Sequence, residues 1–439
     1  QSTMFCRMRP APERLSRRSL LGGFAAALAG TVPRFATAAE RLSVALEART
    51  ESVALSPGRA ASEVWRLTGA APVLRLQRGA ALDLALTNGL KIPAALSGRG
   101  LALPTPLAVQ APVGPGGRAT MPARLARAGT GLLDLRLLAD GATAPIRPLA
   151  LIVDEAPAAS FDRDEVFLVE DFRLKADGTA IAPGLDPGET ELLYTVNGQL
   201  QPELALPAQA RVRLRFINGC HRAVIALKIA ELGAVRVLAI DSQPAEPFLA
   251  RNGAVVLPPG GRTDVVIDMP PAKAPLPVLL HDGSAARPVA RLLVSTEPPL
   301  RATALPPPAP LPASGLPDQL DLRAAIRAEL ALDGPDWRLP AQFATTMAPA
   351  FQAKAGRVIV LALANKTAGT AVVHLHGQPF RLLDRLDDGW KPYWLDTLAL
   401  EAGQTQRIAF LAEQSGRFLI ESMATNWAAP RRLRWYEIR

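Results

Sequence analysis

The segment Ala371-Val372-Val373-His374-Leu375-His376-Gly377-Gln378-Pro379-Phe380 contains two of the four histidines in the chain. His374 and His376 are two residues apart, and in an extended strand this spacing places both imidazoles on the same side. Imidazole is the side chain that most often ligates metals in proteins. The first hypothesis is therefore a metal site, or the remains of one, on a β-strand.

The chain around this segment has a β pattern from residue 41 onwards. Hydrophobic and polar residues alternate at 42–46 and again at 82–86, after the turn at Gly79. Short segments of this kind recur between Gly and Pro turns, and no long segment with a period of 3.6 residues appears. The segment 322–332 fits either a helix or a strand. The sequence predicts an all-β fold built from β-sandwiches.

The length and the turn-rich breaks predict the domain organisation. A chain of 439 residues corresponds to about three domains of about 150 residues each. One break lies at 157–160, and the clearest linker contains Pro306-Pro307-Pro308, because consecutive prolines favour an extended spacer. We predict an N-terminal segment at 1–38, domains at 39–155, 156–300 and 319–439, and a Pro-rich linker at 301–318.

The N-terminal segment has the features of an export signal. Ser16-Arg17-Arg18-Ser19-Leu20-Leu21 is followed by an apolar run at 22–32 and by Ala36-Thr37-Ala38, which has the form of a cleavage site. This resembles a twin-arginine signal, and the alternative is a basic amphipathic or membrane-anchoring segment. The signal predicts export by the twin-arginine translocase to the periplasm, with no membrane span in the mature chain.

The charge and the cysteine content of the chain constrain its function only weakly. The formal charge is +9, but residues 1–38 hold six Arg and one acid, which leaves 43 basic against 39 acidic residues. We therefore predict no nucleic-acid partner. Cys6 precedes the signal, so the mature chain keeps Cys220 alone and forms no internal disulfide. Cys220 is interpreted as a small buried apolar residue, with a reactive thiol as the alternative.

The densest motifs lie at 193–268 and 366–423. They include Leu257-Pro258-Pro259-Gly260-Gly261-Arg262-Thr263-Asp264 and Trp394-Leu395-Asp396-Thr397. These phrases resemble the multicopper oxidase superfamily, and the resemblance extends over residues 41–439. It implies three consecutive cupredoxin-like Greek-key β-sandwich domains. In that family four His-X-His pairs hold a three-copper cluster, and one Cys, two His and usually a Met hold a separate blue copper.

The resemblance implies that most copper ligands are lost in this chain. Of the four His-X-His pairs, only His374-Leu375-His376 is kept. The other pairs fall on segments that contain Arg99, on Asp134-Leu135-Arg136 and on Glu421-Ser422-Met423, and the blue-copper positions fall on Ala371, Ser422 and Trp427. A blue-copper site needs a thiolate, which Ser422 cannot supply. His221 and His281 have no partner at ligand spacing and are interpreted as ordinary polar or turn residues.

If the resemblance holds, the replacing residues face one another. We expect a metal-free polar cluster in which two guanidinium groups replace metal charge, two carboxylates neutralise them through bidentate hydrogen bonds, and Trp427 fills the vacated blue-copper space. This cluster comprises Arg99, Asp134, Arg136, His374, His376 and Glu421. The alternative is a residual metal site, with copper as the cofactor, formed by His374, His376, Glu421, Asp134 and Met423.

An export signal combined with lost copper ligands resembles the copper-free, division-associated branch of the superfamily, the FtsP (SufI) type. The resemblance implies a non-catalytic periplasmic binding or scaffold protein without cofactor. It also implies protein partners in the periplasm, including the division machinery, and a role in supporting cell division under stress. The alternative is a copper-dependent oxidoreductase or copper-handling protein that uses His374 and His376.

Overall fold

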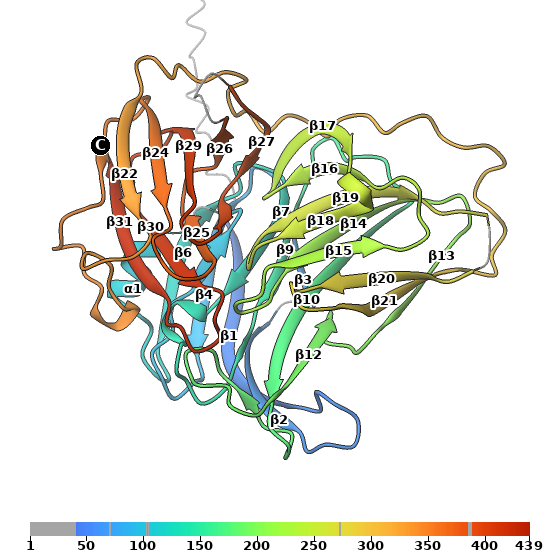
Figure 1. Cartoon of the computed structure of the whole chain (residues 1–439), viewed down its shortest axis with the longest axis horizontal. Helices are drawn as coiled ribbons and strands as arrows, with labels where there is room; N and C mark the ends of the chain where they lie inside the picture. The colour runs from blue at the N-terminus through green and yellow to red at the C-terminus, as the bar shows by residue number, and fades with distance from the viewer. Residues whose placement is uncertain (1–40, 70–71, 102, 104, 272–273, 385–388) are drawn as a thin grey trace, which may run out of the picture. The chain divides into compact units, whose positions relative to one another are not determined.

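A computed structural model describes residues 41–439, apart from 70–71, 102, 104, 272–273 and 385–388. Within these residues the chain forms 31 strands, one short helix, α1 (Thr105–Gln110), and three 3-10 segments, at Arg136–Leu138, Arg251–Gly253 and Pro340–Gln342 (Figure 1). No helix in this described part is long and apolar enough to cross a membrane. The all-β prediction is confirmed. The predicted signal at 1–38 lies outside the described residues and stays a prediction.

The first third of the described chain forms two sheets that share one core. Their strand orders are β6-β4-β1-β2-β8 and β3-β9-β7-β5. Leu46 and Leu84 from the first sheet pack with Leu133 and Leu151 from the second. The strands are β1 (Leu42–Val53), β2 (Ser62–Thr68), β3 (Val73–Gln77), β4 (Ala81–Asn88), β5 (Ser97–Arg99), β6 (Arg118–Arg124), β7 (Gly129–Asp134), β8 (Ile146–Arg147) and β9 (Leu149–Asp154).

The second third repeats this plan. One sheet has the order β11-β10-β14-β19-β16-β17, with β12 paired to β10, and the other has the order β13-β21-β20-β15-β18. The strands are β10 (Arg163–Leu174), β11 (Ala180–Ile181), β12 (Glu191–Val196), β13 (Glu203–Leu206), β14 (Arg211–Asn218), β15 (Ile225–Ile229), β16 (Arg236–Ile240), β17 (Gln243–Leu249), β18 (Ala254–Leu257), β19 (Arg262–Asp268), β20 (Leu276–His281) and β21 (Ala286–Val294).

The last third forms two five-stranded sheets, of order β22-β24-β29-β26-β27 and β23-β31-β30-β25-β28. The strands are β22 (Ile326–Ala331), β23 (Gln352–Ala353), β24 (Val358–Ala364), β25 (Ala371–Leu375), β26 (Phe380–Leu383), β27 (Trp390–Leu395), β28 (Thr397–Leu400), β29 (Thr405–Leu411), β30 (Gly416–Ala424) and β31 (Arg432–Ile438). The segment 322–332, which fitted a helix or a strand, contains β22, which pairs in parallel with β24.

Three asparagines repeat one structural role across the three parts. Asn88, Asn218 and Asn365 lie at or just after the ends of β4, β14 and β24, and all are buried. Each side-chain amide donates hydrogen bonds to at least two main-chain carbonyls, and each side-chain oxygen accepts the N–H two residues further on. The same asparagine hydrogen-bond pattern in each third of the chain indicates three related units. Residues 41–439 nevertheless cluster as one unit, so the exact domain boundaries stay a prediction.

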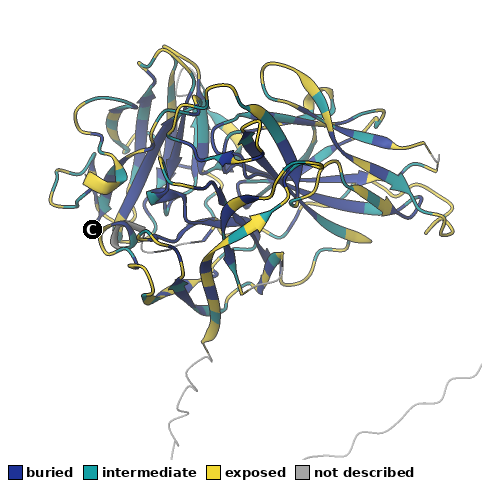
Figure 2. Ribbon diagram, turned by 90° about the horizontal axis from the view of Figure 1, so that it is seen from below, coloured by how far each residue is buried: buried dark blue, intermediate teal, exposed yellow. Residues whose placement is uncertain are grey.

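Burial follows the strands, as Figure 2 shows. All five residues of β25 are buried, because this strand lies inside its sheet between β30 and β28. His374 is in register with Glu421 on β30 and with Thr397 on β28. The strand that carries His374, and that ends one residue before His376, is therefore shielded on both edges and on both faces.

Candidate functional site

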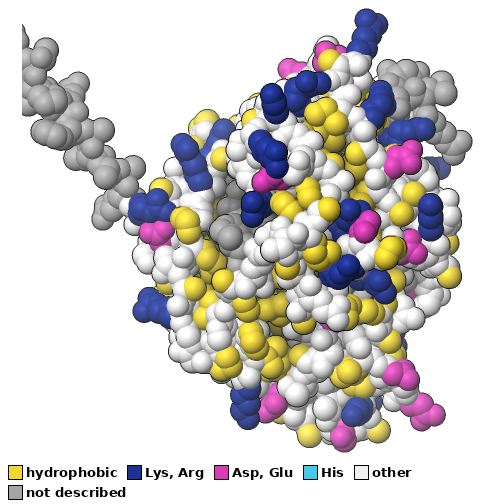
Figure 3. All heavy atoms as spheres, turned by 90° about the vertical axis from the view of Figure 1, so that its left-hand side faces the viewer, with side chains coloured by type: hydrophobic (Ala, Val, Ile, Leu, Met, Phe, Trp, Pro, Cys, Tyr) yellow, Lys and Arg dark blue, Asp and Glu magenta, His cyan; other side chains and the backbone are white. Residues whose placement is uncertain are grey.

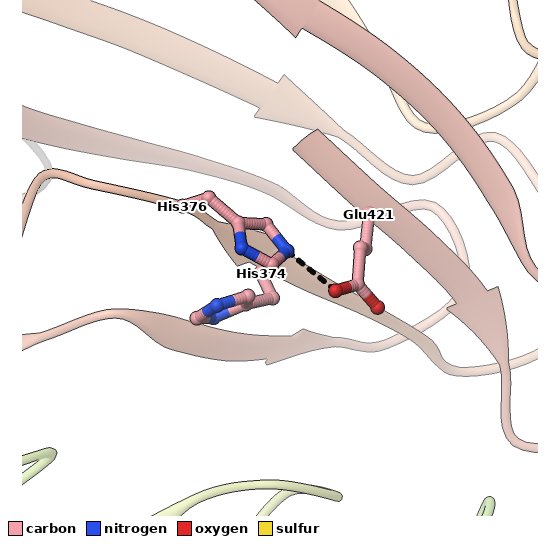
Figure 4. Close-up of side chains that lie close together, drawn as sticks. All are labelled: His374, His376 and Glu421. Atoms are coloured by element: carbon pink, nitrogen blue, oxygen red, sulfur yellow. Dashed lines mark hydrogen bonds and ion pairs between the residues drawn. The ribbon is translucent and has the colours of Figure 1, made fainter. Parts of the chain in front are cut away.

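The candidate site is the buried group of His374, His376 and Glu421 (Figure 4). The two imidazole rings lie with centroids 4.3 Å apart at an interplanar angle of 72°. Glu421 reaches the pair from β30, and its Oε1 lies 2.5 Å from His376 Nε2. One nitrogen of each histidine and one oxygen of Glu421 lie within 4.8 Å of one another. The three side chains therefore have the spacing of a metal-ligand set.

The hydrogen bonds of His374 fix its tautomer. His374 Nδ1 lies 2.9 Å from the main-chain oxygen of Asp396 and 3.0 Å from Thr397 Oγ1. A carbonyl oxygen only accepts hydrogen bonds, so Nδ1 carries the proton and Nε2 keeps its lone pair. Burial lowers the pKa of His374 to about 3, helped by the charges of Arg99 and His376. His374 is thus a neutral imidazole at physiological pH.

Two arginines surround the Glu421 carboxylate. Arg431 donates a short hydrogen bond to Oε2, and Arg99 Nη2 lies 3.7 Å from the same oxygen. Arg99 also donates to Thr397 Oγ1 at 3.2 Å. Burial alone would raise the pKa of Glu421, but Arg431, Arg99 and His376 hold it well below its usual range. Glu421 is therefore an ionised carboxylate whose charge is already neutralised by the protein.

A second set of charges fixes the Asp396–Thr397 turn behind His374. Arg262 donates to both carboxylate oxygens of Asp396, at 2.8 and 2.7 Å. Asp241 accepts the main-chain N–H groups of Asp396 and Thr397 at 2.9 and 3.2 Å. These contacts join the second and third units and hold in place the groups that orient His374.

Asp134 and Arg136 have other partners than the expected bidentate pairs. Asp134 Oδ1 accepts from Ser97 Oγ at 2.9 Å and from the main-chain N–H of Arg136 at 3.0 Å. The Arg136 guanidinium donates to the main-chain oxygens of Gly219 and Cys220. Arg99, His374, His376 and Glu421 thus meet in one group, whereas the two other members of the expected cluster make separate contacts. The alternative of a residual metal site included Asp134 among the ligands, but Asp134 is not part of the ligand-spaced group.

The positions matched to copper ligands have structural surroundings. Met423 Sδ lies 3.9 Å from Arg222 Nη1. Ala371 belongs to the hydrophobic core of the third unit, and Ser422 Oγ donates to the main-chain oxygen of Leu332 at 2.9 Å. The buried Trp427 ring donates from Nε1 to the oxygen of Ala182 at 3.1 Å.

The two other histidines and the cysteine lie away from the site. His221 Nδ1 lies 2.8 Å from Asp171 Oδ1 in the interior of the second unit. His281 is exposed and accepts the N–H of Gly283, as a turn residue does. Cys220 is fully buried, and burial raises the pKa of its thiol well above the usual value. A protonated, buried thiol is unreactive, which supports the apolar interpretation of Cys220 over the reactive one.

A small cavity of about 70 Å³ lies beside His374. Its lining is mostly polar and includes side chains from all three units: Arg99, Arg127, Asp241, Gln243, His374 and Asp396. The Gln243 side-chain oxygen is buried without a hydrogen-bond partner among the described residues. The cavity has the polarity and the room to hold water next to the imidazole.

Several residues of the site carried no usable signal in the sequence. Arg431 has no motif spacing to Glu421, so sequence reasoning missed it. Arg262, Asp396 and Thr397 stand in the two quoted motifs, yet their mutual contact depends on the packing of two units. Asp241 was missed for the same reason.

Surface charge is dispersed on the face that Figure 3 presents. Lys and Arg side chains lie scattered among acidic and hydrophobic side chains there, without one large basic patch.

The comparisons with known proteins agree with the fold. Residues 319–430 match the family model described as multicopper oxidase. A multi-copper oxidase from Pseudomonas thermotolerans superposes with a TM-score of 0.75 and 24% identity, covering 91% of this chain and 100% of that one. Lac15 from a marine microbial metagenome gives a TM-score of 0.71 and 21% identity, with 91% and 100% covered.

A laccase-like multi-copper oxidase CueO from Ochrobactrum sp. gives a TM-score of 0.72 and 18% identity, and covers 90% of this chain and 97% of that one. No curated protein sequence matches the chain. The chain therefore has the cupredoxin-like fold of the multicopper oxidases, and its C-terminal region matches their family model.

Proposed function

We propose that the protein is a non-catalytic, copper-free relative of the multicopper oxidases that acts as a binding or scaffold factor in the periplasm. The observation that carries this proposal is the charge around Glu421. Its carboxylate is ionised and already paired with Arg431 and Arg99, and it is bonded to His376. The protein's own guanidinium groups stand next to the carboxylate that a metal cation would need.

A metal ion would have to break existing contacts in order to bind. His376 Nε2 and Glu421 Oε1, two of the three atoms at ligand spacing, are hydrogen-bonded to each other. The fixed positive charges of Arg99 and Arg431 would repel a metal cation in this buried site of low dielectric constant. The hydrogen bonds of the His374 ring use Nδ1 and leave the lone pair of Nε2 available.

The blue-copper positions also do not fit copper. A thiolate is needed to give such a site its electron-transfer character, and Ser422 stands at that position with its hydroxyl bonded to Leu332. Ala371 and Trp427 lack a ligating nitrogen with a free lone pair. No reaction step through copper can be derived from these residues.

The test is metal analysis of the purified chain. After loading with Cu²⁺ and Zn²⁺ and desalting, mass spectrometry should find much less than one metal per chain. His374→Ala should leave this value unchanged, as should the matched control His281→Ala, which changes an exposed histidine outside the site. One bound metal per chain, lost in His374→Ala and kept in His281→Ala, would overturn the copper-free proposal.

The second candidate is a metal-binding oxidoreductase or copper-handling protein. One observation favours it: His374 Nε2 keeps its lone pair, and a polar cavity lies beside the ring. Cu(I) or Zn²⁺ would then have to displace Arg431 from Glu421. This candidate predicts one metal per chain in the parent protein, and tighter metal binding in Arg431→Met, because the competing charge is removed.

The periplasmic location and the division link derive from the Arg17-Arg18 signal and from family resemblance. A fluorescent fusion should be found in the periplasm, and Arg17→Lys combined with Arg18→Lys should keep it in the cytoplasm. A deletion strain should divide normally in standard medium and form filaments under envelope stress. Normal division under both conditions would remove the division component of the proposal.

A further inference from the structure

A cavity of about 830 Å³ lies between the second and third units. We call it the Arg173 groove, and its lining includes Arg173, Tyr194, Val256, Leu398, Glu401 and Trp427. Its volume falls in the range of about 300–1,000 Å³ that is typical of ligand sites in proteins. None of the residues of the Glu421 group lines it.

Arg173 is an unpaired cation in this groove. Its guanidinium carbon lies 5.8 Å from the centre of the Trp427 ring. Its Nε is buried without a hydrogen-bond partner, and within the described part of the chain no acceptor or carboxylate contacts the rest of the side chain. Contact with the ring face fixes the plane of a guanidinium and leaves the N–H groups at its edge free to bind a carboxylate in bidentate fashion.

Three other charged side chains in the groove have partners. Asp171 is hydrogen-bonded to His221 at 2.8 Å, and Arg222 is paired with Asp140 at 2.8 Å. Asp282 accepts from the Tyr194 hydroxyl at 3.0 Å and is paired with Arg287. Glu401 is exposed at the rim. Arg173 is therefore the positive group in the groove that a ligand can still neutralise.

The walls of the groove include the outer strands of two sheets. β18 is the last strand of one sheet and β28 the last strand of another, and Val256 and Leu398 from these strands line the same cavity. Val256 is 68% exposed, which is unusual for a large apolar side chain. Outer strands present unpaired main-chain groups, and an extended peptide can add to such an edge through main-chain hydrogen bonds.

We propose that the Arg173 groove binds an extended peptide segment of a partner protein. The segment carries a carboxylate side chain that pairs with Arg173 and an apolar side chain that covers Val256. This inference rests on the proposed role as a binding factor, and it names the kind of partner that this role requires.

The experiment starts from a library of random ten-residue peptides, selected on the purified chain. The enriched peptides should contain an acidic residue flanked by β-branched residues, and their dissociation constants are measured by fluorescence anisotropy. Because a charge-assisted hydrogen bond is lost, Arg173→Gln should weaken binding by at least about tenfold. Val256→Asp should also weaken it, while Leu249→Asp should not, since Leu249 is similarly exposed on β17 but does not line the groove.

Thermal melting should confirm that all three variants stay folded, because Arg173 makes no ion pair and the other two side chains are exposed. Equal peptide affinity in the parent chain and in Arg173→Gln would overturn the proposal. Competition by N-acetylglutamate at the concentration of the peptide would also overturn it, since the site would then take a free carboxylate and not a strand.

The two proposals fail in different ways. A stoichiometric metal at His374 would overturn the copper-free function and leave the peptide result standing. A metal-free chain whose peptide affinity is unchanged by Arg173→Gln would overturn only the proposal that the groove binds a peptide.

Discussion

Asp264 and Glu421 are two buried carboxylates that each lie between two guanidinium groups, yet their surroundings differ. Arg213 Nη2 and Arg215 Nη1 lie 2.5 and 3.3 Å from Asp264 Oδ2. Arg431 and Arg99 contact Glu421 in the same manner. Arg99 of the first unit contacts Glu421 of the third, and Thr130 of the first unit donates to Asp264 of the second at 2.6 Å.

The difference lies in the total charge. Around Asp264 each arginine has a second carboxylate as well: Arg213 pairs with Glu155 at 2.8 Å, and Arg215 pairs with Asp164 at 2.6 Å. Around Glu421 the two arginines pair with that one carboxylate, which also contacts His376. The main-chain N–H of Arg431 donates to Asp140, and Arg99 donates to Thr397 Oγ1.

Burial is the main cause that lowers the pKa of His374 to about 3; the charges of Arg99 and His376 lower it further, and Asp396 acts in the opposite direction. The guanidinium groups of Arg99 and Arg431 also disfavour a bound metal cation next to Glu421. The Asp264 group pairs two arginines with three carboxylates, Asp264, Glu155 and Asp164, as a structural junction does. In the Glu421 group, formed by Arg99, His374, His376, Glu421 and Arg431, the guanidinium groups of the two arginines take the place that a metal cation would occupy beside the carboxylate.

The largest expected effect tests the junction. Asp264→Leu leaves Arg213 and Arg215 each short of one partner in the interior, and removing one member of a buried ion pair costs about 3–5 kcal/mol. Urea unfolding at neutral pH should show this loss. The control Asp83→Asn removes the exposed pair with Arg41 and should not move the urea midpoint. A small change in Asp264→Leu would show that the junction does not stabilise the fold.

The next effect concerns pH at the flank of the Glu421 group. Burial and the charge of Asp396 raise the pKa of Asp241 to about 6. An acid whose pKa is raised by folding holds its proton more tightly in the folded state, so its contribution to stability is complete below about pH 4 and is lost as pH rises to about 6.

Asp396 behaves in the opposite way. Burial would raise its pKa, but Arg262 and His374 hold it well below the usual value, so its contribution is complete above about pH 4. Between pH 4 and 6 the free energy of unfolding should therefore fall by about 1–3 kcal/mol through Asp241. Asp241→Asn should flatten urea midpoints across this window; an unchanged slope would contradict the assignment to Asp241.

A smaller effect tests the Glu421 group itself. Glu421→Gln keeps the shape of the side chain but removes its charge, so the hydrogen bonds with Arg431 and His376 lose their charge assistance, at a cost of about 2 kcal/mol. Combining it with Arg431→Met should cost less than the sum of the two single changes, because the buried positive charge is removed together with its partner. Additive losses would show that the two residues do not stabilise each other.

Much of the fold was predictable, because it depends on local patterns. Alternation at 42–46 and 82–86 follows from a sheet with one face against a core, and those segments lie in β1 and β4. The His374 and His376 rings do meet, with centroids 4.3 Å apart, although β25 ends at Leu375 and His376 lies in the bend that follows. The segment 322–332 could not be assigned, since a short apolar run fits both periodicities, and pairing with β24 decides it.

The partners within the site were less predictable, because they depend on how the units pack. Asp241 and Asp396 are 155 residues apart in sequence and meet only in the folded chain. Arg431 pairs with Glu421 across adjoining parts of β30 and the turn before β31, with no motif to mark the pair. Family resemblance placed Asp134 and Arg136 near the vacated copper space, but it could not indicate that Arg136 binds main-chain carbonyls.

The smallest expected effect comes from removing the hydrogen bonds between Arg136 and those carbonyls. It distinguishes a structural role of Arg136 from an electrostatic role at the Glu421 group. If Arg136 has a structural role, Arg136→Met leaves the main-chain oxygens of Gly219 and Cys220 without donors. The free energy of unfolding should then fall by about 1–2 kcal/mol, with no change in metal content. If it instead supplies repulsive charge to the Glu421 group, Arg136→Met should keep the melting temperature and raise zinc binding at His374. Since its guanidinium donates to the second unit and makes no ion pair with Glu421, we expect the loss of stability alone.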